Sequence, residues 1–367
     1  MSRSTGAQGT DPVSWAVAER VASQLLRFVP PLEPATVAAL EVDFATATAR
    51  AERLVEEATG LVSPAPAPRG QVTDRAGWVR ANIASFRRLL RPVGERLAAG
   101  PPAARRALSP ANTTLAGVEV GVLLAWMSGR VLGQYDLLPV DGDAQSTGGA
   151  LYYVGPNVAA IERRYGFAPE QFRLWIALHE VTHRAQFTAV PWMRAHFVGL
   201  VERGMAVAAP DGRAVLDSLL RAAAEVRAGR NPLAEAGLIG LLASADQLAA
   251  LRDAQALMSL LEGHGDVVMS RAATEAIPDA PRFARTLAER RTSAPWAVRV
   301  AQQVLGVEAK LRQYREGERF VEAVEQVGGA ELFALVWSSP AMLPSLEEIR
   351  DPERWLARVG GVPAGRA

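Results

Sequence analysis

Apolar residues recur every three or four positions along most of the chain, and this spacing predicts amphipathic helices. The pattern covers 13–28, 34–58 and 74–98, and the aspartate at position 74 is a favourable N-cap residue. A proline-rich connector at 63–70 cannot continue a helix, so we expect a loop there. Residues 115–132 are apolar on nearly every side and predict a largely buried helix.

The helical spacing fails between Gln134 and Asn157, where glycine and aspartate residues indicate turns. Within this stretch, 151–154 is a short β-prone run that Gly155 and Pro156 close. We expect it to pair with 137–140 as a hairpin or short sheet. An exposed edge strand at this place can bind an extended peptide by strand addition. A purely structural hairpin is the alternative.

Helices return after this hairpin. A helix that Pro169 opens and Pro191 ends is apolar on most sides, so we expect it to be buried. Further helices are predicted at about 192–208, 212–228, 232–242, 245–270, 281–291, 295–305, 308–327 and 330–337. Prolines 340, 344 and 352 indicate a tail that is mostly loop with one short helical turn. The predicted fold class is therefore mainly α, with a small β-hairpin or short sheet at about 137–154.

The expected domain organisation is simple. We interpret 1–11, which is rich in Ser, Gly and Thr, as a disordered leader and 12–367 as one domain. That domain has a helical N-terminal part at 12–132, a central part at 133–330 and a C-terminal tail at 331–367. Nearly half of the residues are apolar, which is enough for a large core.

Charge and cysteine content narrow the chemistry. The 40 Lys and Arg residues nearly balance the 39 Asp and Glu residues, which argues against a nucleic-acid or acidic-membrane partner. Cysteine is absent, so disulfides, thiolate ligands and cysteine nucleophiles are excluded. The N-terminus lacks the apolar core of a signal peptide, and the most apolar window, 118–127, is too short to span a bilayer. We expect a cytoplasmic protein of undetermined oligomeric state.

One motif indicates metal chemistry: His179-Glu-Val-Thr-His183, within the helix predicted at 169–191. Histidines four residues apart lie on one face of a helix, so both imidazoles can bind one Zn²⁺. Glu180 beside the first histidine can reach a water molecule on that metal. A single histidine on an apolar face is usually structural, but the pair with its glutamate predicts a metal site.

The motif needs a third protein ligand, because a catalytic zinc ion takes three and keeps one position for water. Glu262 is the leading candidate, since it lies in an apolar segment where a charge needs a partner. Asp266, one turn further, could accept a hydrogen bond from a ligating histidine. His264 is the competing ligand, and it points to nearly the opposite side of the helix from Glu262. Gly263 and Gly265 would let this helix pack closely against the metal helix.

The residue types also predict a mechanism. Zinc would activate a water molecule, and Glu180 would take its proton and deliver it to the leaving amine. A further donor should stabilise the oxyanion; the sequence does not identify it, and Tyr314 is the candidate we name for this catalytic role, with a structural aromatic residue as the other interpretation. The alternatives are Tyr152, Tyr153 and His264. We interpret the remaining histidine, His196, as structural or substrate-facing.

Segments spread from about Trp15 to Trp355 carry a resemblance to a known family. They are Gly133-Gln-Tyr-Asp136, Tyr153-Val-Gly-Pro-Asn157, Trp175 through His183, Pro191-Trp192, Glu262-Gly-His264 with Val268-Met269, and Arg312-Gln-Tyr314 with Gly317 and Phe320. Together they resemble bacterial zincin-like metallopeptidase family 2, which is found mainly in actinobacteria. Some members are labelled as deazaflavin-coenzyme-biosynthesis-associated hydrolases.

The resemblance implies a mostly helical zincin-like fold and a zinc-dependent hydrolase or peptidase. The gluzincin pattern, in which a later helix supplies a glutamate ligand, is similar to the arrangement expected here. It implies His179, His183 and Glu262 as the ligands of one Zn²⁺ and Glu180 as the base.

Three functions remain open at this point. The leading hypothesis is a zinc metallohydrolase, a peptidase with a peptide or small amide substrate. The second is an amidase or other hydrolase of a small metabolite, which a small closed pocket would favour. The third is a non-catalytic helical interaction protein, whose structural zinc would have no open position.

Overall fold

A computed structural model of the chain describes residues 10–66, 70–138, 148–205, 244–292 and 307–360. Helices dominate, and a small three-stranded mixed sheet accompanies them, so the predicted fold class is confirmed. The helices are α1 (Trp15–Leu26), α2 (Pro34–Thr59), α3 (Arg75–Ala99), α4 (Pro102–Arg105), η1 (Arg106–Leu108), α5 (Pro110–Ser128), α7 (Gly155–Tyr165), α8 (Pro169–Thr188), α9 (Met193–Gly204), α12 (Ala245–Ala276), α13 (Ala280–Thr292), α15 (Val307–Ala334), η2 (Leu335–Trp337), η3 (Pro340–Met342), α16 (Leu346–Arg350) and α17 (Pro352–Gly360).

The ends of several helices follow from local chemistry. The Asp74 carboxylate accepts the backbone N–H of Gly77 at 2.6 Å and caps α3 as expected. Gly60 ends α2 with a φ of 68°, a conformation that glycine adopts without steric cost. The helices predicted at 212–228, 232–242 and 295–305, and the leader up to residue 9, lie outside the described residues.

One expectation about an apolar segment needs correction. Helix α5 begins at Pro110 and is buried along one side only, since Leu115, Val118 and Val122 are exposed.

None of the helices within the described ranges combines the length and the apolar character needed to span a bilayer by itself. One bent pair, Pro102–Leu108 with Pro110–Ser128, passes that test of length and composition together.

The sheet has the order β1-β3-β2, with β1 at Gly70–Thr73, β2 at Gly133–Asp136 and β3 at Ala150–Val154. Strand β1 pairs parallel to β3, and β2 pairs antiparallel to it. The strand expected at 151–154 is confirmed, but its predicted partner at 137–140 is wrong. Its neighbours are β2 at 133–136 and β1 at 70–73, which follows the proline-rich connector. The parallel pairing of β1 was not predicted because a long-range pairing leaves no local sequence signal. Strand β3 is therefore central, and strand addition to it is excluded.

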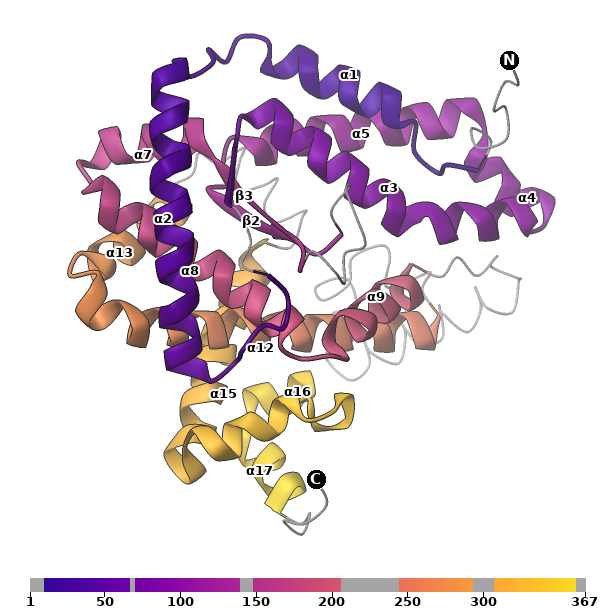
Figure 1. The fold of residues 1–367 in the computed structure, drawn as a ribbon. Helices are drawn as coiled ribbons and strands as arrows, with labels where there is room; N and C mark the ends of the chain where they lie inside the picture. Colours follow the sequence, from indigo (N-terminus) through magenta and orange to yellow (C-terminus); the bar gives the residue numbers. More distant parts are fainter. Residues whose placement is uncertain (1–9, 67–69, 139–147, 206–243, 293–306, 361–367) are drawn as a thin grey trace.

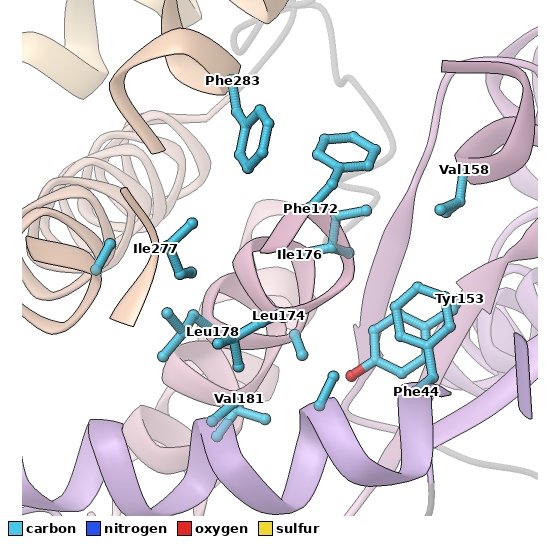
Figure 2. Packing of buried hydrophobic residues seen from close by; sticks show 14 of the residues in the cluster. Phe44, Tyr153, Val158, Phe172, Leu174, Ile176, Leu178, Val181, Ile277 and Phe283 are labelled. Atoms are coloured by element: carbon cyan, nitrogen blue, oxygen red, sulfur yellow. The ribbon is translucent and has the colours of Figure 1, made fainter. Parts of the chain in front are cut away.

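The sheet lies between two groups of helices in Figure 1, with α1, α3 and α5 on one side and α8 and α12 on the other. Helix α2 runs along α8. As expected, α8 is buried on most sides, and its apolar residues form the centre of the main core (Figure 2). The rings of Phe44 and Tyr153 stack in this core with centroids 3.9 Å apart. This core holds the predicted metal helix in a fixed orientation.

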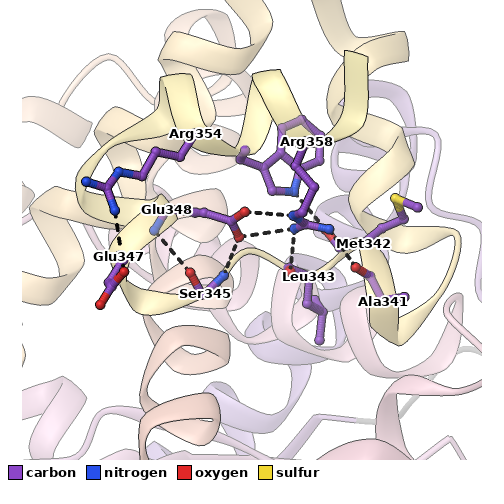
Figure 3. Close-up of polar contacts among 9 residues, drawn as sticks. Ala341, Met342, Leu343, Ser345, Glu347, Glu348, Arg354 and Arg358 are labelled. Carbon is purple, nitrogen blue, oxygen red and sulfur yellow. Dashed lines mark hydrogen bonds and ion pairs between the residues drawn. The ribbon is translucent and has the colours of Figure 1, made fainter. Parts of the chain in front are cut away.

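Helix α7 and the C-terminal region were not expected. Pro156, interpreted as a turn residue, occupies the first turn of α7, where its missing N–H costs nothing. The tail expected to be mostly loop instead contains α16 and α17 and buries Trp355 completely. In Figure 3, Arg358 donates to the Glu348 carboxylate at 2.7 Å and to the Ala341 and Leu343 carbonyls. Tertiary packing stabilises these short elements, so periodicity alone cannot reveal them.

A close helix crossing fixes α12 against α15. A Cβ atom at Gly263 would lie 2.1 Å from the backbone carbon of Gly317, and one at Gly317 would lie 1.9 Å from the carbonyl oxygen of Ser259. The expectation that Gly263 packs against the metal helix is therefore wrong. Gly265 does face α8, at an ordinary 3.8 Å from Cε1 of His183.

We predict that Gly263→Ala lowers the free energy of unfolding by about 1–3 kcal/mol, because the added methyl group meets immovable backbone. Gly265→Ala is the matched control in the same helix. It should leave this free energy unchanged or raise it by up to about 1 kcal/mol, because alanine is the better helix former. Urea titrations followed by circular dichroism measure both changes. Equal stability of Gly263→Ala and the wild type would contradict the close crossing.

Candidate metal centre

Two helices bring three ligand side chains together. Helix α8 carries His179 and His183 one turn apart, and α12 carries Glu262. The Nε2 atoms of the two histidines are 3.3 Å apart, and Nε2 of His183 lies 3.8 Å from Oε2 of Glu262. One donor atom from each of the three residues lies within 4.8 Å of the others.

The size of this cluster fits zinc. A tetrahedral zinc ion with bonds of about 2.0–2.1 Å holds two imidazole nitrogens about 3.3–3.4 Å apart. The observed 3.3 Å between the Nε2 atoms of His179 and His183 matches this distance. The side chains of His183 and Glu262 are 15% and 18% exposed, so solvent can reach the cluster. Three protein ligands with access for a fourth are the usual set of a catalytic zinc site.

Glu180 lies beside the cluster in a buried position. Its Oε2 accepts the backbone N–H of Tyr135 at 2.8 Å, which orients the carboxylate. Burial raises the pKa of Glu180 to about 8, the charge of Glu262 adds to this shift, and the Tyr135 hydrogen bond opposes it. A cation held at the cluster would favour the charged form and so lower this pKa. The group can therefore exchange a proton near neutral pH.

Strand β2 is held in place from its other side by α3. Gln134 and Asn82 exchange two amide hydrogen bonds, of 3.1 and 3.2 Å. The Ser85 hydroxyl donates to the buried Asp136 carboxylate at 2.8 Å. Because alternate residues of a strand face opposite ways, these anchors leave Tyr135 directed at the metal helix. Helix α3 thus positions the backbone N–H that orients Glu180.

Gly133 sets how closely β2 approaches the base. A Cβ atom at this position would lie 2.7 Å from both Cγ and Oε1 of Glu180. Only glycine leaves room for the carboxylate here.

Comparison with known proteins identifies the family. The family model described as zincin-like metallopeptidase matches residues 13–356. The chain belongs to the zincin-like metallopeptidase family. A crystal structure of a provisionally assigned hydrolase with a novel fold, from Chloroflexus aurantiacus, is 32% identical, with a TM-score of 0.70 and a match covering 95% of this chain and 99% of that one. Comparison with curated proteins gives no match.

The histidines outside the zincin-like ligand set have other roles. His264 is buried, its Nδ1 lies 2.9 Å from Nε2 of Gln186, and its ring stacks on Phe333. Burial lowers the pKa of His264 to about 3, so this ring is neutral. As the helix geometry predicted, it does not join Glu262 in the cluster. His196 lies on α9, with its ring against Trp192 at 5.7 Å.

Gln186 was not among the site residues expected from the sequence. Its Oε1 lies 3.0 Å from Nδ1 of His183, the ring nitrogen that faces away from the cluster. Asp266, expected to bond a ligating histidine, is an exposed residue of α12, and that role stays a prediction; at Nδ1 of His183 the hydrogen-bond partner is Gln186. The available signal was its position three residues after His183, on the same helix face.

The tyrosines proposed as oxyanion donors have different outcomes. Tyr153 is buried in the core and shares a 2.9 Å hydrogen bond with Thr48, so its assignment as a donor is wrong. Tyr152 lies in β3, paired in register with Gln134 of β2. Tyr314 lies in α15, but its side chain falls outside the described part of the chain, and its catalytic role stays a prediction.

We predict that the purified protein binds one Zn²⁺ per chain and that His179→Ala or Glu262→Ala lowers zinc affinity at least about 100-fold, because two ligands hold zinc much more weakly than three. His196→Ala should bind zinc as the wild type does. Competition titration against a chromogenic chelator, with metal content checked by mass spectrometry, measures this. Unchanged affinity in Glu262→Ala would contradict Glu262 as the third ligand.

Proposed function

We propose that this zincin-like protein is a zinc-dependent hydrolase that cleaves peptide bonds. The proposal rests on one observation. His179, His183 and Glu262 converge at distances that fit zinc, and the buried Glu180 lies beside them. Membership of the zincin-like metallopeptidase family supports it. The glutamate ligand on a separate helix supports a gluzincin-like ligand set.

The residues of the site have separate roles in the proposed hydrolysis. His179, His183 and Glu262 would hold the zinc ion, which when bound would supply an acidified water molecule and polarise the scissile carbonyl. Glu180 accepts a proton from the water molecule that attacks, and the N–H of Tyr135 keeps the carboxylate in place for this. Burial then favours the protonated form of Glu180, so the same group can hold the proton and deliver it to the leaving amine.

The position of β2 supports a peptide substrate. Strand β2 is an edge strand of the described sheet, and it lies next to α8. The backbone N–H of Tyr135 in this strand donates to Glu180 and not to the neighbouring strand β3. An extended chain can align with such an edge through backbone hydrogen bonds, which would place its amide groups next to the base. A small amide would not use this edge, so a substrate panel separates the two classes.

We predict that Glu180→Gln binds zinc as the wild type does but loses hydrolysis by about 10²–10⁴-fold, because the amide cannot accept the proton. Zinc-loaded protein is incubated with a mixture of unrelated peptides and, separately, with a panel of small amides. Cleavage products are then identified by mass spectrometry. His196→Ala is the control that should cleave normally.

The results decide among the three functions. Cleavage of peptides that Glu180→Gln abolishes supports the proposal. Cleavage confined to small amides would replace it with an amidase. Zinc that occupies a fully protein-ligated site, with no cleavage in either panel, would replace it with a structural metal.

We predict that Gly133→Ala retains zinc but slows hydrolysis by about 100-fold, because the added methyl group displaces the Glu180 carboxylate. Gly129→Ala is a nearby control, since the nearest atom to its Cβ, the carbonyl oxygen of Trp126, is 3.8 Å away. Initial rates and zinc titrations on both variants give the comparison. A fully active Gly133→Ala would refute the close fit between β2 and Glu180.

A further inference from the structure

A buried amide connects the two helices that carry the metal ligands. Gln186 is completely buried on α8. Its Oε1 lies 3.0 Å from Nδ1 of His183, and its Nε2 lies 2.9 Å from the carbonyl oxygen of Leu261 and 2.9 Å from Nδ1 of His264. All polar atoms of this side chain are thus engaged within α8 and α12.

The carbonyl of Leu261 fixes which way the amide faces. A backbone carbonyl can only accept, so the NH₂ group of Gln186 must be the end that meets it. The amide oxygen is then the end that meets His183, and it can only accept. Nδ1 of His183 must therefore carry a proton. In the neutral ring, Nε2 then keeps its lone pair, and this is the atom that faces His179 and Glu262.

The second N–H of the amide determines the proton on the other ring. It is directed at Nδ1 of His264, which must accept, so the proton of this neutral ring sits on Nε2. The ring cannot easily turn away, because it stacks on Phe333 and meets Trp337 edge-on, with centroids 5.3 and 5.2 Å away. The far end of the hydrogen-bond chain is thus held rigidly.

We propose that Gln186 is a positioning residue that locks His183 in the Nδ1-protonated tautomer and so presents the Nε2 lone pair to the metal. A neutral imidazole can carry its proton on either nitrogen, and only one choice leaves Nε2 able to bind zinc. This inference rests on the proposed zinc site and names the residue that prepares it.

The same amide also joins the two helices that carry the ligands. Leu261, whose carbonyl it binds, directly precedes Glu262. The hydrogen bonds to His183 and to Leu261 therefore tie a ligand of α8 to the backbone beside the ligand of α12. A carboxylate could accept from His183, but it could not donate to Leu261 or His264. An amide is the only side-chain group of this length that does both.

The tautomers can be read in the metal-free protein by ¹⁵N-detected NMR of the imidazole rings, which is practical because the chain has four histidines. Wild-type protein should show His183 protonated on Nδ1 and His264 protonated on Nε2. Assignment uses the single variants His179→Ala, His196→Ala and His264→Ala, each of which removes one ring, so that His183 is identified by elimination. A wild-type His183 protonated on Nε2 would overturn the proposal without any Gln186 variant.

Two substitutions separate positioning from simple packing. Gln186→Met keeps the length but has no amide, so His183 should lose its single tautomer and zinc affinity should fall about 10–100-fold. Gln186→Glu still accepts from His183, so it should keep the tautomer and hold zinc within a few-fold of wild type. It should also melt at a lower temperature, because its oxygen faces the Leu261 carbonyl. Thr188→Val, which removes another hydrogen bond from α8, should change neither tautomer nor affinity.

The results that would overturn the role of Gln186 differ from the result that would refute the proposed function. A folded Gln186→Met that keeps the His183 tautomer and its zinc affinity overturns the positioning role. Equal losses of affinity in Gln186→Met and Gln186→Glu also overturn it, because packing alone would explain them. Wild-type protein that binds no zinc refutes the proposed function, and the metal-free spectra then still report the orientation of Gln186.

Discussion

The contact between α8 and α12 is the constraint on which the candidate site depends. Neither helix alone supplies enough ligands, and the third donor reaches the two histidines only at one separation of the helices. The core around α8 fixes one partner, and the close crossing of Gly263 with Gly317 fixes the other against α15. Gln186 spans the gap between them with hydrogen bonds, which are more directional than apolar contacts. The ligand geometry is therefore a product of the whole helical core.

Polar groups on a buried helix must find partners, and this requirement explains the surroundings of the site. The buried carboxylate of Glu180 accepts a hydrogen bond from a backbone N–H of β2, and hydrogen bonds from Asn82 and Ser85 of α3 hold that strand in place. Nδ1 of His183 forms its hydrogen bond with the side-chain amide of Gln186. Each partner that meets this energetic need also restricts the orientation of a reactive group. The hydrogen bonds that make the burial of these polar groups tolerable therefore also hold the groups in the orientation that the chemistry needs.

The sequence predicted what depends on local spacing. The i, i+4 histidines, the helix that carries them and the Asp74 cap all follow from periodicity and side-chain chemistry. The convergence of Glu262 with the histidines also agrees with the expectation, since a charge in an apolar segment needs a partner. Long-range pairings were not predictable: β1 beside β3, β2 rather than 137–140 as the antiparallel neighbour, and Gly263 against α15. Gln186 was missed because two of its three partners, Leu261 and His264 of α12, lie far along the chain from its neighbour His183.

In the proposed metal centre, two imidazole nitrogens and one carboxylate oxygen hold a single zinc ion and leave a position for water. Diffraction from zinc-loaded crystals, with data on both sides of the zinc absorption edge, would locate such an ion. We expect one anomalous peak, about 2.0–2.2 Å from Nε2 of His179, Nε2 of His183 and a carboxylate oxygen of Glu262, with a solvent molecule as the fourth ligand. A peak elsewhere, or a fourth protein ligand that closes the site, would contradict this arrangement.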